Sequence, residues 1–188
     1  MKIFHGLSKV ISTIAIPIII FSLTACSSPK DPKSQQLNAI NDIRESLKLP
    51  KSPLEFVEIT ADGNSPSGDL QVAIYQDSEG RKYSVSQETN QVVEIDARAI
   101  LENISPDTPA LLPDELKAKA MNYVKATVSN FDSLQSSWQY EEGAKIGTYF
   151  YNWYGKQAPG SMNRPRIQIC LHQSGLLFCY YNTLTLKK

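Results

Sequence analysis

The stretch Leu70–Asp96, LQVAIYQDSEGRKYSVSQETNQVVEID, decides the fold class of this chain. It contains three runs rich in β-branched and aromatic residues, which are Leu70–Gln76, Lys82–Ser86 and Val92–Asp96. Turn-forming residues around Gly80 and Asn90 separate the runs. Short runs of this kind, bounded by Gly, Asn, Asp and Ser, are typical of strands joined by tight turns. The stretch therefore predicts consecutive antiparallel strands.

A further strand and a helix are predicted on the N-terminal side. The run Leu54–Thr60 has strand character, and Asp62–Pro66 is turn material. Before it, apolar residues recur at helical spacing, and Ser34 is the predicted N-cap of this helix. Pro50 is expected to end it. The apolar positions of the helix are Leu37, Ile40, Ile43 and Leu47.

The rest of the chain repeats this plan. After a proline-containing connection, Pro113-Asp114-Glu115 is expected to open a second helix, because proline suits the first turn and acids favour the positive end of the helix dipole. The predicted buried stripe is Leu116, Ala120, Tyr123, Val124, Thr127 and Phe131. The predicted strands are Ser136–Glu141, Ile146–Tyr154, Arg166–His172 and Leu176–Leu184, with the loop Gly155–Pro165 between the middle two.

The sequence thus predicts an α+β fold in two halves, residues 34–101 and 113–188. Each half has one helix packed on a four-stranded antiparallel sheet, because neither element can bury its apolar side alone. The last hairpins of the halves also correspond. Thr89–Val92 lines up with Ser174–Leu177, and Asn90 and Gly175 occupy the position where a turn favours positive φ.

Part of the first half resembles a known family. The residues Tyr75, Asp77, Gly80, Tyr83, Val85, Thr89 and Val92 follow the order Y-x-D-x-x-G-x-x-Y-x-V-x-x-x-T-x-x-V. This order resembles the PepSY and YpeB-like modules of peptidase propeptides and bacterial envelope proteins. The segment Arg166–Tyr181 is similar to a more divergent copy. Two departures are Ser86, where the family has an acid, and Asn90, where it has glycine. The resemblance implies a noncatalytic module that binds or restrains envelope peptidases, and it supplies no catalytic residue.

The N-terminal segment indicates a targeting signal and a membrane anchor. A segment with two lysines precedes the nearly all-aliphatic run Val10–Phe21, which leads into Leu23-Thr24-Ala25-Cys26. This order resembles the lipobox of bacterial lipoproteins, which implies lipidation of the Cys26 thiol and cleavage before it. An uncleaved transmembrane helix and an ordinary secretory signal are the alternatives. The run is short for a bilayer core of about 30 Å and contains Pro17.

We therefore expect a signal peptide at residues 1–25 and a flexible, polar tether at 26–33. The mature chain then has 17 basic and 19 acidic residues, so no basic surface for nucleic acid is predicted. The lipid bilayer is the first expected partner, reached through acylated Cys26. The predicted location is the extracytoplasmic side of the bacterial envelope. Ser27 favours the outer membrane if the source is Gram-negative.

Cys170 and Cys179 form the strongest chemical pair. A turn centred on Ser174-Gly175 pairs His172 with Leu177 and places the two cysteines directly opposite each other. With a two-residue turn they fall at a non-hydrogen-bonded pair, where Cα atoms lie about 4.5 Å apart, within disulfide reach. A structural disulfide is predicted outside the cytoplasm. Two reduced core thiols are the alternative, and the spacing lacks the C-x-x-C of redox enzymes.

The run Tyr149–Tyr154 is aromatic on both faces of its predicted strand. Tyr149, Tyr151 and Trp153 point one way, and Phe150 and Tyr154 point the other. One set is expected under the second helix. The first set is a candidate binding face for peptide or glycan, and burial of both faces between the halves is the alternative.

Catalytic groups are scarce. His172 is the only histidine after the signal peptide, so a multi-histidine metal site is not expected, and no cofactor motif is present. The acids Glu141, Glu142, Asp77 and Glu79 are interpreted as solvated residues at strand ends and turns. The predicted function is noncatalytic binding or restraint of an envelope protein. The alternatives are a structural part of an envelope assembly and a carboxylate-dependent hydrolase.

Overall fold

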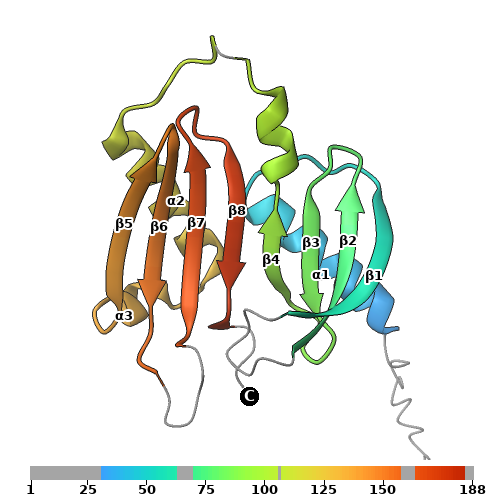
Figure 1. Ribbon diagram of the computed structural model, residues 1–188. Helices are drawn as coiled ribbons and strands as arrows, with labels where there is room; N and C mark the ends of the chain where they lie inside the picture. Colours follow the sequence, from blue (N-terminus) through green and yellow to red (C-terminus); the bar gives the residue numbers. More distant parts are fainter. Residues whose placement is uncertain (1–30, 63–69, 106, 158–163, 185–188) are drawn as a thin grey trace, which may run out of the picture.

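The computed structural model describes residues 31–62, 70–105, 107–157 and 164–184 (Figure 1). Its helices are α1 (Pro32–Ser46), α2 (Pro113–Thr127), the short α3 (Phe131–Gln135) and the 3-10 helix η1 (Arg98–Asn103). Its strands are β1 (Leu54–Asp62), β2 (Leu70–Asp77), β3 (Lys82–Ser86), β4 (Val92–Asp96), β5 (Gln139–Lys145), β6 (Thr148–Tyr154), β7 (Arg166–His172) and β8 (Leu177–Asn182). The α+β class and the order of one helix and four strands, twice, are as predicted.

The two predicted sheets are joined into one. All eight strands form a single antiparallel sheet in the order β1-β2-β3-β4-β8-β7-β6-β5 (Figure 1). The junction is the β4–β8 pair, in which Ile95 lies opposite Tyr180. The halves are therefore not independent units. Since the last strand of each half pairs with the last strand of the other, β1 and β5 are left as the edges.

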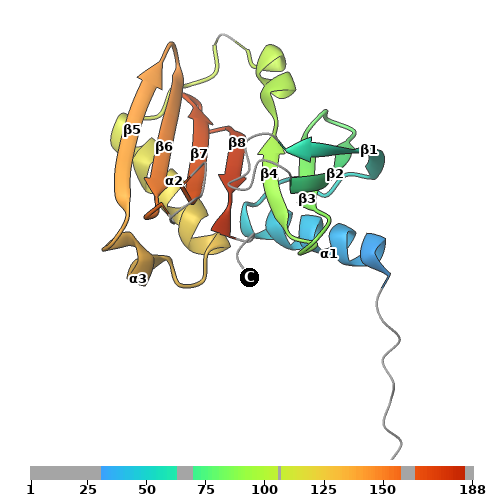
Figure 2. The same cartoon turned by 60° about the horizontal axis from the view of Figure 1, so that its bottom comes forward.

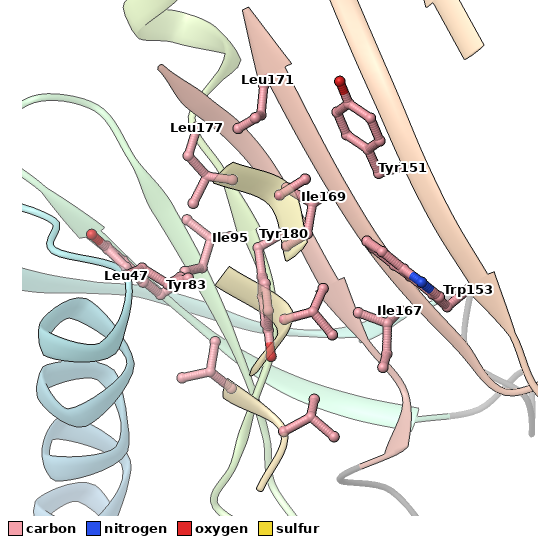
Figure 3. Close-up of a cluster of buried hydrophobic side chains, with 14 of the residues drawn as sticks. Leu47, Tyr83, Ile95, Tyr151, Trp153, Ile167, Ile169, Leu171, Leu177 and Tyr180 are labelled. Atoms are coloured by element: carbon pink, nitrogen blue, oxygen red, sulfur yellow. The ribbon is translucent and has the colours of Figure 1, made fainter. Parts of the chain in front are cut away.

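Both long helices pack on the same face of this sheet (Figure 2). One buried cluster joins α1, through Ile40, and α2, through Leu116, to side chains from β2, β3, β4, β6, β7 and β8. Figure 3 shows part of this cluster, with Ile95 and Tyr180 at the junction of the halves. A smaller cluster of Leu70, Val72, Val93 and Tyr181 lies apart from it. The core is thus continuous across the halves.

Helix α1 begins earlier than predicted. Asp31 is its N-cap and Pro32 its first residue, so the helix includes the last two residues of the predicted tether. Proline at the first turn needs no N–H donor there, which explains the earlier start. Residues 26–30 of the tether lie outside the described residues. The most buried positions of α1 are Gln36, Ile40 and Arg44, while Leu37 and Ile43 lie at the sides of the buried stripe.

Helix α2 begins at Pro113 as predicted but ends at Thr127. The N–H of Leu112 donates to the carboxylate of Glu115 at 2.8 Å, which closes the first turn. Val128 is extended, with φ −129° and ψ 97°, and breaks the helix. Phe131 is buried as predicted, but it belongs to α3. The spacing of apolar residues in the sequence cannot distinguish one long helix from two consecutive helices that bury the same side.

The hairpin turns explain two further differences. Ile146 and Gly147, predicted as strand, form the β5–β6 turn with φ of 38° and 72°. In the β7–β8 turn, the His172 N–H donates to Leu176 O, and Leu171 pairs with Leu177. Positive φ at Asn90 and Gly175 is confirmed, at 54° and 82°. The turn predicted at Asp62–Pro66 lies outside the described residues beyond its first member.

The β-bulges show how the halves correspond. The β3–β4 register shifts between Ser84 and Val85, and the β7–β8 register shifts between Cys170 and Leu171. When the two bulges are superimposed, β3 aligns with β7, and Tyr83 corresponds to Ile169. Tyr83 pairs with Tyr75 of β2, and Ile169 pairs with Tyr151 of β6, so Tyr75 corresponds to Tyr151. The helices align by their buried positions, which are Gln36, Ile40 and Arg44 in α1 and Leu116, Ala120 and Val124 in α2. The chain is thus built on an internal pseudo-two-fold plan.

Candidate functional site

The predicted aromatic binding face is largely core. Trp153 is 1% exposed and Tyr151 4% exposed, both on the helix-covered side of β6 (Figure 3). Trp153 packs against Phe131 and Tyr140, with ring centroids 5.5 and 5.4 Å apart. Helix α2 covers this side, which leaves Trp153 unavailable to a partner. Tyr149 is half-buried, and Tyr149 and Tyr151 line a pocket between β6, β5 and the first turn of α2.

Aromatic side chains on the other face of β6 also have contacts. Phe150 packs edge-on against Phe178 of β8, with centroids 6.1 Å apart. The guanidinium of Arg164 lies 4.0 Å from the ring centroid of Tyr154. The halves lie side by side in one sheet, so neither face of β6 is buried between them. The alternative prediction, that both faces of this strand are buried between the halves, is therefore also wrong.

The predicted register of the cysteine pair is confirmed. Cys170 of β7 lies directly opposite Cys179 of β8, after a bulge at the neighbouring pair. Both are free thiols in the structure, Cys170 buried and Cys179 half-buried, so the disulfide stays a prediction. Hydrogen bonding to Cys179 and burial raise the pKa of the Cys170 thiol.

The family-like motif of the first half forms a buried polar cluster under α1. Asp77, at the end of β2, has a side chain that is 0% exposed, and Arg44 of α1 is 1% exposed. Asp77 Oδ2 accepts from the Arg44 and Arg81 guanidiniums at 3.2 Å each and from the Tyr83 hydroxyl at 3.0 Å. Asp77 Oδ1 accepts from the backbone N–H groups of Glu79 and Arg81. The interpretation of Asp77 as a solvated acid is therefore wrong.

Other residues in the same stretch also connect helix α1 to the sheet or position the polar cluster. The Tyr75 hydroxyl donates to Gln36 of α1 at 2.8 Å. Gly80 has φ of 88°, which lets the chain turn back to bring Arg81 onto Asp77. Asn90 holds the start of α1 through hydrogen bonds with Gln35 and Gln36. The motif thus fixes the helix to the sheet.

The cluster cannot act as an acid or base on a substrate. Burial alone would raise the pKa of Asp77, but hydrogen bonds from Arg81 and Tyr83 and the charge of Arg81 hold it below its ordinary value. Burial raises the pKa of Tyr83 to about 12. Both groups keep their protonation state near neutral pH and do not contact solvent. The cluster is structural.

The single histidine of the folded part belongs to a turn. Nδ1 of His172 lies 2.9 Å from Ser174 Oγ and accepts from the Ser174 N–H at 3.2 Å. Both contacts are two residues apart and cap the β7–β8 turn. The described segments contain no group of three or more His, Cys, Asp or Glu side chains arranged to hold a metal ion.

The anchor predicted at Cys26 and the signal peptide at 1–25 lie outside the described residues. Of the helices that are described, none is both long enough and apolar enough to cross a bilayer.

The edge strand β1 is the surface that the sequence did not reveal. Phe56, Val57 and Ile59 are 49%, 46% and 55% exposed. They lie on a nine-residue strand, and β2 is its only neighbour among the strands that the structure describes. Such an edge offers backbone N–H and C=O groups to another strand. We call Phe56, Val57 and Ile59 with the outer side of β1 the β1 edge.

The charge of the β1 edge has one sign. The strand contains Glu55, Glu58 and Asp62 but no lysine or arginine. At the opposite edge of the sheet, β5 carries paired charges: Glu142 bonds Lys117 at 3.0 Å, and Glu141 lies 3.6 Å from Arg164. Charged residues are the usual protection of an exposed strand edge. The two edges therefore differ, and the β1 edge is the apolar and acidic one. Its signal in the sequence is the apolar pair Phe56-Val57, and Val57 is the extra residue of a β-bulge in the β1–β2 pairing.

Comparison of the chain with protein-family models, with curated proteins and with solved structures found no match.

Proposed function

We propose that this protein is a lipid-anchored, noncatalytic binding module of the bacterial envelope, and that it holds an extended segment of a partner protein on the β1 edge. The observation that carries the proposal is the exposure of Phe56, Val57 and Ile59 on an edge strand whose outer side has no neighbouring strand among the described residues. An exposed apolar edge of this length invites pairing with another strand.

The mode of binding is strand addition. The partner segment pairs with the free backbone groups of β1, and pockets between alternate side chains give specificity. Phe56 lies across from Tyr75, and Ile59 across from Ala73, which both belong to the core under the helices. Apolar residues of the partner therefore extend this helix-covered side of the sheet. On the other side Glu58 favours a basic residue, so the fitting segment alternates apolar with lysine or arginine.

The anchor is Cys26, through the lipidation that its lipobox-like context implies. Five residues separate Cys26 from Pro32, the first residue of α1. At most about 22 Å of extended chain can span this interval. The folded part therefore stays close to the membrane surface, where it meets envelope proteins. The PepSY-like motif adds the partner class, an envelope peptidase that the module restrains.

The test compares two peptides on the full chain. We expect a short peptide alternating valine with lysine to protect the backbone amides of β1 from hydrogen exchange, and a valine–glutamate peptide to protect them less. Phe56→Lys with Ile59→Lys should weaken binding more than about tenfold, because each buried apolar side chain contributes roughly 1.5–3 kcal/mol. Ile146→Lys is the matched control, since Ile146 is 95% exposed in the β5–β6 turn.

Two results would count against the proposal. Equal protection by both peptides would remove the charge selection, and protection elsewhere than β1 would remove the site. In cells, Cys26→Ala should leave the precursor unlipidated without changing peptide binding. Unchanged lipid labelling of that variant would refute the anchor alone.

A further inference from the structure

A second candidate site lies at the other end of the sheet from the β1 edge. A pocket of about 320 Å³ is lined by the first turn of α2, strand β5 and strand β6. Pro113, Asp114 and Lys117 contribute from the helix, Glu142 from β5, and Tyr149 and Tyr151 from β6. The volume is at the small end of the range of ligand pockets, which is about 300–1,000 Å³.

The hydroxyl of Tyr151 indicates that the pocket takes a polar group. Tyr151 is 4% exposed, yet its hydroxyl makes no hydrogen bond to any described residue. Figure 3 shows this hydroxyl pointing away from Trp153. Other buried tyrosines have partners: the hydroxyl of Tyr75 bonds Gln36, and that of Tyr83 bonds Asp77. The side chain is buried, but its hydroxyl is not shut off from solvent, because it opens onto the pocket. A polar group of a ligand that enters the pocket can therefore hydrogen-bond to it.

The charged side chains that line the pocket indicate the charge of the ligand. Lys117 and Glu142 neutralise each other at 3.0 Å, and the Tyr140 hydroxyl also donates to Glu142 at 2.7 Å. Asp114 has no ion-pair partner within the described segments. The ionised side chains of the wall therefore have a net charge of −1, beside two tyrosine rings. Carboxylate and aromatic rings together are the groups that attract organic cations.

We propose that this pocket binds an alkyl ammonium or guanidinium group, with Asp114 as its counter-ion and the Tyr151 hydroxyl as an acceptor. The two tyrosine side chains pack along the alkyl part of the ligand. This chemistry belongs to a lysine or arginine side chain of a protein and to a free alkylamine. The proposal does not depend on strand addition at β1, because the pocket and the β1 edge share no residue.

Calorimetric titration of the full chain in detergent tests the pocket. N-acetyl-lysine amide and N-acetyl-arginine amide should bind, and N-acetyl-norleucine amide, which has no charge, should bind roughly tenfold more weakly or not at all. A glycine peptide with one central lysine and n-butylamine separate the two sources. Tighter binding of the peptide assigns the site to a protein side chain, and tighter binding of butylamine assigns it to a free amine.

Variants link the binding to these residues. Tyr151→Phe keeps the ring and should weaken binding roughly two- to tenfold, the range of one lost hydrogen bond. Asp114→Asn should weaken it further and reduce its dependence on salt. Tyr154→Phe is the matched control, since Tyr154 lies on the opposite face of the same strand. Equal binding of norleucine amide, tighter binding of N-acetyl-glutamate amide, or equal loss in the control would overturn the proposal.

Discussion

Replacing Asp77 by alanine should be among the most damaging single changes in the fold. The carboxylate accepts five hydrogen bonds, two at Oδ1 and three at Oδ2. Without it, the guanidiniums of Arg44 and Arg81 stay buried with only part of their partners. Removing one member of a buried ion pair costs about 3–5 kcal/mol, because the remaining charge is left uncompensated. This is a large share of the roughly 5–15 kcal/mol that stabilises a typical domain.

The assay is guanidinium unfolding of the full chain in detergent, followed by far-ultraviolet circular dichroism. Asp96→Ala is the matched control, because Asp96 pairs with Arg98 at 2.6 Å but Arg98 is 73% exposed. An exposed pair contributes about 0–1 kcal/mol. The free energy of unfolding should therefore fall several times more for Asp77→Ala than for Asp96→Ala. Equal losses of unfolding free energy in the two variants would refute the argument that burial makes the Asp77 ion pairs strongly stabilising.

The pH dependence of the Asp77 contribution has a definite sign. Burial opposes ionisation, but the Arg81 and Tyr83 hydrogen bonds hold the pKa of Asp77 below its ordinary value. The stabilisation is complete above the pKa of the unfolded chain, about 3.9. It is lost as the pH falls through the lower pKa of the folded state. The difference between wild type and Asp77→Ala should thus be constant near neutral pH and shrink below about pH 4.

Three further predictions follow from local geometry. Trp153→Ala should lower the free energy of unfolding by about 3–5 kcal/mol, because this 1%-exposed side chain fills the core under α2; a loss within experimental error would return it to the surface. Gly175→Ala should lower it by about 1–2 kcal/mol, since φ is 82° and the added methyl would meet a side chain at 2.7 Å. Gly143→Ala, with open space around it, should change it by less than about 0.5 kcal/mol; equal effects of the two would contradict the strain. Mild oxidation should join Cys170 to Cys179, with a mass lower by two hydrogens and no thiol left to alkylate, and persistence of two alkylated thiols would exclude the bridge.

Local patterns predicted most of the elements but not how they assemble. Strands β2, β3 and β4 follow from turn residues at Gly80 and Asn90, whose φ angles are positive as expected. The β4–β8 pair was not predictable in this way, because it joins residues more than eighty positions apart. Alternation of side chains says which face of a strand is buried, but it does not say which strand is its neighbour. The two halves therefore looked like two sheets.

The buried polar cluster escaped prediction for a related reason. Arg44 occupies a core position of α1, between apolar residues of the helical stripe. A charge at such a position is stable only with a partner, and the partner, Asp77, lies at the end of β2, more than thirty residues away. Each residue alone resembles a solvated surface charge. Only the tertiary contact reveals that they belong to the core, as it also reveals the exposed apolar side chains of β1.

The polar cluster distinguishes two halves that otherwise follow the same plan. Under the bulge alignment, the positions of Asp77, Arg81 and Tyr83 correspond to Trp153, Ile167 and Ile169, all apolar. The alignment of the helices places Arg44 opposite Val124 in the same way.

This difference bears on which helix covers which half. If α1 packed on the second half, Arg44 would be buried among Trp153, Ile167 and Ile169 without a carboxylate. If α2 packed on the first half, Val124 would leave Asp77 and Arg81 short of a partner. The first misplacement buries an unpaired charge, which is among the most costly defects in a core. The second removes one of the two guanidiniums that bond the Asp77 carboxylate and leaves only Arg81. We infer that the cluster fixes α1 to its own four strands, and that a pseudo-symmetric sheet with one continuous core thereby has a single arrangement of helices.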